Sequence, residues 1–193
     1  MVVSKAIYNR RAIRNYTDEP VPEAVVRKLI DAAIQAPSAM NHQPWAFVVV
    51  QDKGLLKEVS DRAKSLLADA EPFAHFPSVP HQGEAHEEFN VFYNAGTLIV
   101  ICAGEGAPHP DWDCCLAGMN LMLEAEELGY GTCVIGLAWG ALESEEVREK
   151  LGIPAEYKPI LPIIVGRPRE EPPSHGRNAP RILKWVTALT ASR

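Results

Sequence analysis

Apolar positions recur along the chain with two different periods, and they predict a mixture of helices and strands. Helical spacing predicts helices at 4–14, 23–36, 54–70, 111–128, 143–151 and 180–190. Short apolar runs predict strands at 45–51, 97–103, 131–136 and 160–166. Because the order has no strict strand–helix–strand repeat, we expect an α+β fold with a central sheet flanked by helices.

Three stretches carry more specific expectations. The run TLIVICA at 97–103 has almost no polar position, which predicts a strand buried on both faces. Pro162 interrupts the last strand, so we expect it at a sheet edge or at a bulge. Residues 71–88 contain three prolines, three histidines and four acidic residues. Long irregular segments of this kind in compact domains are often functional.

Length and charge bound the class of protein. The 193 residues suffice for one core, and we expect a single domain over 1–193 whose residues 167–193 form a C-terminal extension. The formal charge of −6 argues against nucleic acid as the main partner. Apolar runs fall far short of the ~18 residues of a membrane span, and the N-terminus lacks a secretory signal pattern. We therefore expect a cytoplasmic protein without a membrane partner.

Metal binding is only weakly supported. The cysteines Cys102, Cys114, Cys115 and Cys133 show no C-x-x-C spacing, and we expect Cys102 and Cys133 in the core. The histidines His75, His81 and His86 match no helical face. A small metal-binding protein that uses these side chains stays an alternative, although we expect no metal site.

The basic run NRRAIRNY, residues 9–16, is the first candidate for chemistry. On a helix, Arg10 and Arg14 would share one face. Two guanidinium groups on one face make a clamp for a phosphate or carboxylate. The alternative is a solvated basic face paired with Asp18 and Glu19.

Two further stretches place polar or small residues beside a strand. In APSAMNHQPW, residues 36–45, the neutral side chains of Ser38, Asn41 and Gln43 suit the edge of a heterocycle with mixed donors and acceptors. Capping of the loop's own backbone is the alternative. In GYGTCVIGLAWG, residues 129–140, glycines would let the backbone approach a ligand, or they would serve ordinary turns.

The order of these elements resembles the FMN-dependent nitroreductase family. The resemblance rests on the basic run, the APSxxNxQPW loop, the LxAEELGYGTCVIG element and a late VGRP strand end, and it covers about residues 4–184. It implies a mainly antiparallel sheet between helices and a homodimer with FMN at its interface. It also implies a ping-pong reaction in which NADH or NADPH passes a hydride to FMN, and a nitroaromatic, a quinone or a similar flat acceptor then takes the electrons.

The resemblance also implies roles for residues of this chain. Arg10, Arg11, Arg14 and the backbone of Ala12 would hold the ribityl phosphate and the pyrimidine edge. Ile135, Gly136 and Leu137 would line the isoalloxazine, with a backbone N–H aimed at N5, and Arg177 would be a second phosphate ligand. The loop would belong to the cofactor site as well, through Pro37, Ser38, Ala39, Asn41 and Gln43. Ser38 and Asn41 would contact the cofactor of the partner subunit, and Gln43 would help hold the loop or reach the ring. No catalytic side chain is expected, because N5 of FMN carries the chemistry.

Residues 71–92 are the candidate substrate lid. Its aromatic residues Phe73, Phe76, Phe89 and Phe92 could cover an acceptor, or they could pack in the core. Two alternatives stay open for the activity. One is other flavin chemistry on this scaffold, namely cleavage of flavin, reductive dehalogenation or alkene reduction. The other is a module that binds FMN without turnover.

Overall fold

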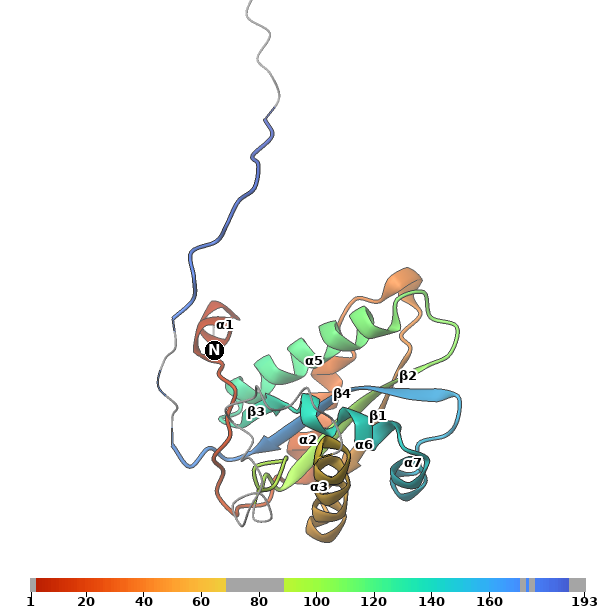
Figure 1. Cartoon of the computed structure of the whole chain (residues 1–193). Helices are drawn as coiled ribbons and strands as arrows, with labels where there is room; N and C mark the ends of the chain where they lie inside the picture. The colour runs from red at the N-terminus through yellow and green to blue at the C-terminus, as the bar shows by residue number, and fades with distance from the viewer. Residues whose placement is uncertain (1–2, 69–88, 171–172, 174–175, 188–193) are drawn as a thin grey trace, which may run out of the picture.

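One antiparallel sheet lies between two layers of helices (Figure 1). The computed structural model of the protein describes residues 3–68, 89–170, 173 and 176–187. Its strands are β1 (Trp45–Val50), β2 (Thr97–Gly104), β3 (Gly131–Val134) and β4 (Tyr157–Gly166). Its helices are α1 (Val3–Asn9), α2 (Glu23–Ala33), α3 (Lys53–Ala68), α5 (Pro110–Glu127), α6 (Trp139–Glu143) and α7 (Glu145–Leu151), with short 3-10 helices η1 (Ala39–Asn41) and η3 (Gly136–Ala138).

The strand order is β1-β2-β4-β3, and every neighbouring pair is antiparallel. This confirms the predicted α+β class with its antiparallel sheet. Residues 97–103 of the inner strand β2 are all buried, as the run TLIVICA predicts, and so are residues 162–166 of the other inner strand, β4.

Alternate residues of β2 supply two separate cores. Leu98 and Val100 belong to the core formed with α3, α6 and α7. Ile99 and Ile101 belong to the core formed with α2 and α5. Because side chains alternate along a strand, one apolar run serves both helical layers.

The first predicted helix is too long. Arg10 N–H donates to the carbonyl of Ala6 at 2.9 Å, and the chain then becomes extended. Ile13 N–H donates to the carbonyl of Thr132 at 3.0 Å, and Ala12 forms a parallel bridge with Thr132. Pairing with the outer edge of β3 therefore replaces helix over residues 10–14.

One more helix prediction is wrong, and the structure decides between the two places expected for Pro162. Residues 180–187 of the predicted helix 180–190 have no helical structure and are exposed, and they belong to a tail that runs away from the body (Figure 1). Pro162 lies in an inner strand, so of its two expected places the edge is wrong and the bulge agrees with the structure. The sheet tolerates it beside an irregularity, since Ile101 pairs with Leu161 whereas Cys102 pairs with Pro159. No helix among the described residues is long and apolar enough to cross a membrane.

Candidate functional site

The arginine run is a strand-like segment along the edge of the sheet. Arg10, Ala12 and Arg14 alternate with Arg11 and Ile13 along extended backbone. The expectation of one helical face is therefore wrong, but the alternation of an extended chain puts Arg10 and Arg14 on the same side. Since Ile13 N–H faces β3, the N–H of Ala12 points away from the sheet.

Two glycines let this segment lie against the sheet. A Cβ at Gly131 would be 2.5 Å from a side-chain carbon of Ile13, and one at Gly166 would be 2.7 Å from the ring of Tyr16. The Tyr16 hydroxyl donates to the carbonyl of Ile13 at 2.6 Å and fixes the turn that follows Arg14. Burial raises the pKa of the Tyr16 phenol, and the nearby Cys133 raises it further, so the hydroxyl keeps its proton.

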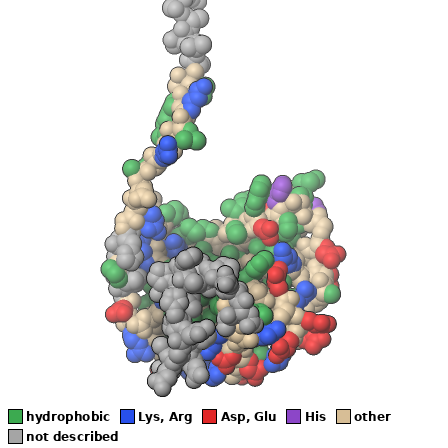
Figure 2. Space-filling view, viewed as in Figure 1, with side chains coloured by type: hydrophobic (Ala, Val, Ile, Leu, Met, Phe, Trp, Pro, Cys, Tyr) green, Lys and Arg blue, Asp and Glu red, His purple; other side chains and the backbone are tan. Residues whose placement is uncertain are grey.

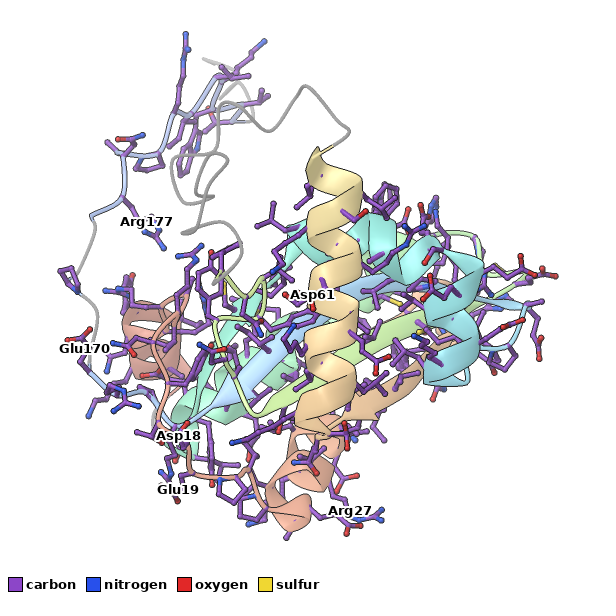
Figure 3. The ribbon with its side chains drawn as sticks, turned by 60° about the horizontal axis from the view of Figure 1, so that its bottom comes forward. Asp18, Glu19, Arg27, Asp61, Glu170 and Arg177 are labelled. Atoms are coloured by element: carbon purple, nitrogen blue, oxygen red, sulfur yellow. The ribbon has the colours of Figure 1, made fainter. Side chains whose placement is uncertain are left out.

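The expected acidic partners of Arg10 and Arg14 bind other arginines. Asp18 pairs with Arg169 at 4.0 Å, and Glu19 pairs with Arg167 at 3.6 Å. Figure 3 shows Asp18 and Glu19 side by side, away from the labelled Arg177 on the tail. The structure therefore does not support a solvated face in which Asp18 and Glu19 neutralise the clamp.

Arg10 and Arg14 retain donors for a ligand. Within the described residues, Nε of Arg10 is buried and has no hydrogen-bond partner. The guanidinium carbon of Arg14 lies 5.8 Å from the ring centroid of Tyr93. Burial raises the pKa of the Cys133 thiol, while the charges of Arg14 and Arg10 lower it, which places both charges near β3. Unpaired guanidinium donors beside an apolar strand are a site for an anion.

The end of β3 leads directly to Ile135 and Gly136, in the glycine-containing stretch at 129–140. Ile135 is buried and donates its N–H to the carbonyl of Pro162 at 3.0 Å. Gly136 begins η3 and is exposed, and a Cβ there would meet nothing within 4 Å. The first N–H groups of a helix have no partner within that helix, so this turn offers donors to a ligand in open space.

The loop before β1 is held in an unusual backbone conformation. Met40, Asn41 and Gln43 have φ values of 52°, 58° and 48°, which non-glycine residues rarely adopt. Gln43 N–H donates to Ser38 Oγ at 2.9 Å, and Gln43 Nε2 donates to Asn41 Oδ1 at 3.0 Å. Part of the predicted polar set thus stabilises the loop itself. The Asn41 amide nitrogen and the Gln43 side-chain oxygen remain as a donor and an acceptor.

Sequence reasoning missed the residue that anchors this loop. Asp113 lies in the first turn of α5, is 3% exposed, and accepts a hydrogen bond from Ala39 N–H at 3.0 Å through Oδ1. Its Oδ2 is buried without a partner among the described residues. A signal existed in the sequence, because Asp113 precedes the apolar stripe of Ala117 and Leu121 by one helical turn.

Within one folded chain, the polar loop and the arginine segment lie at opposite ends of the molecule. Asp113, which anchors the loop, and Glu127, at the other end of α5, are separated by about 21 Å of helix. The sheet agrees, because the loop enters β1 at Trp45 opposite Ala103, whereas Thr132 is two strands from Thr97. Thr97 and Ala103 are about 20 Å apart along β2. One chain therefore places the arginine segment beside β3, the strand that leads to Gly136, and far from its own loop.

The remaining predicted residues lie elsewhere. Phe92 is fully buried in the core with α3, and Phe89 is half-buried with its ring edge-on to Tyr93. Core packing was the alternative for both. Phe73, Phe76 and the three histidines lie outside the described residues. Arg177 is on the exposed tail and donates to the carbonyl of Gly176 at 3.3 Å (Figure 3).

The described residues fit the cofactor that the sequence motifs imply. FMN presents a phosphate dianion and a ring edge of mixed donors and acceptors. The buried, unpartnered Nε of Arg10 matches the first requirement, and the amides of the loop match the second. Among the described residues no group of three or more His, Cys, Asp or Glu could hold a metal ion.

Comparisons with known proteins agree with this architecture. The model of the nitroreductase family matches residues 7–167. An NADH dehydrogenase of Thermus thermophilus is 32% identical over 199 residues, which cover 93% of this chain and 94% of that protein.

Solved structures extend the likeness to three dimensions. A nitroreductase with bound FMN from Desulfitobacterium hafniense DCB-2 has a TM-score of 0.79 at 25% identity and covers 96% of this chain and 98% of its own. An FMN-dependent nitroreductase from Clostridium difficile R20291 has a TM-score of 0.78 at 26% identity, with 95% and 99% covered. The sheet, the arginine segment and the family match together lead to one conclusion: the chain belongs to the nitroreductase family.

Proposed function

We propose that the chain is an FMN-dependent oxidoreductase that uses NADH or NADPH to reduce nitroaromatics, quinones or similar flat acceptors. The observation that carries this proposal is the pair Arg10 and Arg14, which lie along β3 with a buried, unpartnered Nε on Arg10 and with Arg14 over a ring face. FMN, when bound, would accept a hydride from the nicotinamide and pass electrons to the acceptor in ping-pong order.

The chain's residues would bind and orient the cofactor. Arg10, Arg11 and Arg14 would bind the phosphate and the pyrimidine edge, with the outward N–H of Ala12 beside them. Charge-assisted hydrogen bonds from guanidinium groups suit a phosphate dianion. Ile135 and Leu137 would line the flavin ring, and Gly136 would let the ring approach the backbone. We keep Arg177 as a second phosphate ligand reached through the tail.

The second half of the site would come from a second copy of the chain. The loop of Pro37, Ser38, Ala39, Asn41 and Gln43 lies too far from its own arginine segment to share one cofactor with it. A two-fold dimer that places the loop of one chain at the Gly136 turn of the other would complete both sites.

An exposed apolar face supports this homodimer. It comprises Val3, Ile7 and Tyr8 of α1 and Trp112, Leu116 and Met119 of α5, which are 37–77% exposed. Figure 2 shows hydrophobic side chains along the upper edge of the body, where α5 runs in Figure 1. The tail adds Ile182, Leu183, Trp185 and Val186, which are 61–87% exposed and suited to an apolar partner surface. Apolar areas of this kind mark protein interfaces.

The test begins with the visible spectrum of the purified chain and the identity of any flavin released on denaturation. About one FMN per chain supports the cofactor, and a colourless chain that does not bind added FMN overturns it. Anaerobic bleaching by NADH or NADPH, followed by recovery of the spectrum with a quinone, supports turnover. Binding without bleaching would instead show the module that binds FMN without turnover.

A further inference from the structure

The short turn before β2 is strained and yet firmly held. Tyr93 and Asn94 have φ values of 52° and 56°, and such a backbone is unfavourable for a bulky side chain. Val91 N–H donates to Ser60 Oγ at 3.0 Å, and Tyr93 N–H donates to the carbonyl of Asn90 at 2.8 Å. A strained residue that its surroundings over-determine is a marker of function.

The turn fixes where the ring of Tyr93 points. Val91 and Phe92, the two residues before Tyr93, are fully buried in the core with α3. Phe89 meets Tyr93 edge to face, with ring centroids 5.7 Å apart and planes at 84°. Tyr93 itself is partly buried and packs against this core, and the Arg14 guanidinium lies over its ring at 5.8 Å.

A ring face suits the task of holding Arg14 without using its hydrogen-bond donors. A guanidinium stacks on an aromatic face while its N–H groups, which lie in its own plane, stay available for an anion. Arg167 provides the contrast, since it stacks on Tyr130 at 4.4 Å but also pairs with Glu19 and donates to the carbonyl of Gly129. Arg14 has neither kind of partner among the described residues.

We propose that Tyr93 is a positioning residue, whose ring holds the Arg14 guanidinium ready for the anionic end of the cofactor. The inference rests on the proposed function and deepens it. The strained turn connects α3 and the core to the arginine segment, so the rigid body of the protein sets the direction of a long and otherwise mobile side chain. A ligand that meets a prearranged guanidinium loses less side-chain entropy on binding.

The experiment compares Tyr93→Leu with Tyr93→Phe in the full chain, stripped of flavin and titrated with FMN and with riboflavin, which lacks the phosphate. Tyr93→Leu should weaken FMN binding about three- to tenfold, the range expected for a lost cation–π contact. Tyr93→Phe keeps the ring face and should bind like the wild type. A larger loss for FMN than for riboflavin places Arg14 at the phosphate and supports the inference, whereas an equal loss for the two flavins overturns it.

Tyr130→Leu is the matched control, since it removes a cation–π contact at an arginine that already has an acidic partner. It should leave the FMN-to-riboflavin preference unchanged, whatever its effect on unfolding by urea. Wild-type affinity in Tyr93→Leu, an equal loss in Tyr93→Phe, or the same flavin-specific loss in Tyr130→Leu overturns the inference. If the wild type binds neither flavin, the proposed function itself is wrong and this inference falls with it.

Discussion

Asp113 and Ala39 lie 74 positions apart, and the carboxylate of one accepts the backbone N–H of the other at 3.0 Å. The bond joins the first turn of α5 to a loop with three left-handed residues. Its acceptor is 3% exposed, so little water can replace it. The geometry of the polar loop therefore depends on a buried side chain in a distant helix.

Replacing Asp113 should lower both the stability of the chain and its affinity for FMN. We expect Asp113→Ala to lower the free energy of unfolding by about 1–3 kcal/mol, because the Ala39 N–H loses its buried partner. FMN affinity should also fall, since the strained loop is released. Asp113→Asn keeps an acceptor at the position of Oδ1 and should lose less. Urea unfolding and FMN titration measure both effects, and wild-type values for Asp113→Ala would contradict this role.

Removing Arg10 or Arg14 should weaken the binding of FMN without unfolding the chain. Arg10→Ala and Arg14→Ala should each lower FMN affinity about tenfold to a hundredfold, the range for a charge-assisted hydrogen bond. Riboflavin affinity should change less. Arg27→Ala is the control, because Arg27 is an exposed residue of α2 paired with Glu23 (Figure 3). An equal loss in all three variants would show a general charge effect instead.

The buried thiols predict a loss of stability in alkali. Burial raises the pKa of Cys102 to about 11 and that of Cys114 to about 12. An unfolded thiol loses its proton near pH 9, so above that pH the unfolded state binds fewer protons and stability falls as pH rises. The loss should reach about 1 kcal/mol per thiol between pH 9 and 10.

Urea unfolding at pH 8, 9 and 10 tests the contribution of these thiols. Cys102→Ala should reduce the slope of stability against pH, whatever its effect at pH 8. Cys115→Ala is the matched control, because Cys115 is exposed, and it should keep most of the slope. An unchanged slope in Cys102→Ala would assign the alkaline loss to other groups, among them the buried Tyr16.

A charge on the apolar face of α5 should separate the proposed dimer. Leu116→Glu should yield monomers in sedimentation experiments, because Leu116 is 47% exposed and its burial in an interface would strand the carboxylate. FMN binding should be lost with the dimer, since the loop and the arginines would no longer meet. Lys53→Glu, at the start of α3 on the other side of the sheet, should stay dimeric. A Leu116→Glu monomer with full FMN affinity would refute the shared site.

The sequence pattern correctly predicted the elements whose form depends only on their own residues. The buried run of β2 and the apolar stripe of α5 could be read directly, because both follow from periodicity. Residues 10–14 could not, because their extended form depends on a hydrogen bond from Ile13 to Thr132, far along the chain. For Pro162 the sequence left an edge and a bulge open, and the choice between them depends on the order of strands, which is a property of the whole sheet.

The candidate site shows the same division. The arginines and the polar loop were found by residue type. Arg10 and Arg14 do share one side, but through the alternation of an extended chain and not on the face of a helix. Asp113 could have been found, because it lies one helical turn before Ala117 and Leu121 on the same apolar stripe. Tyr93 could not, since nothing in the sequence links it to Arg14, 79 positions earlier.

The distance of about 20 Å between the loop and the arginine segment has a genetic consequence if the dimer forms as proposed. An allele with Arg10→Ala and an allele with Asp113→Ala would each spoil both sites of its own homodimer. In a mixed dimer, the intact arginines of one product and the intact loop of the other meet at one of the two sites, and both defects gather at the second. Co-expression of the two inactive alleles would then restore about half of the activity per mixed dimer, as in intragenic complementation.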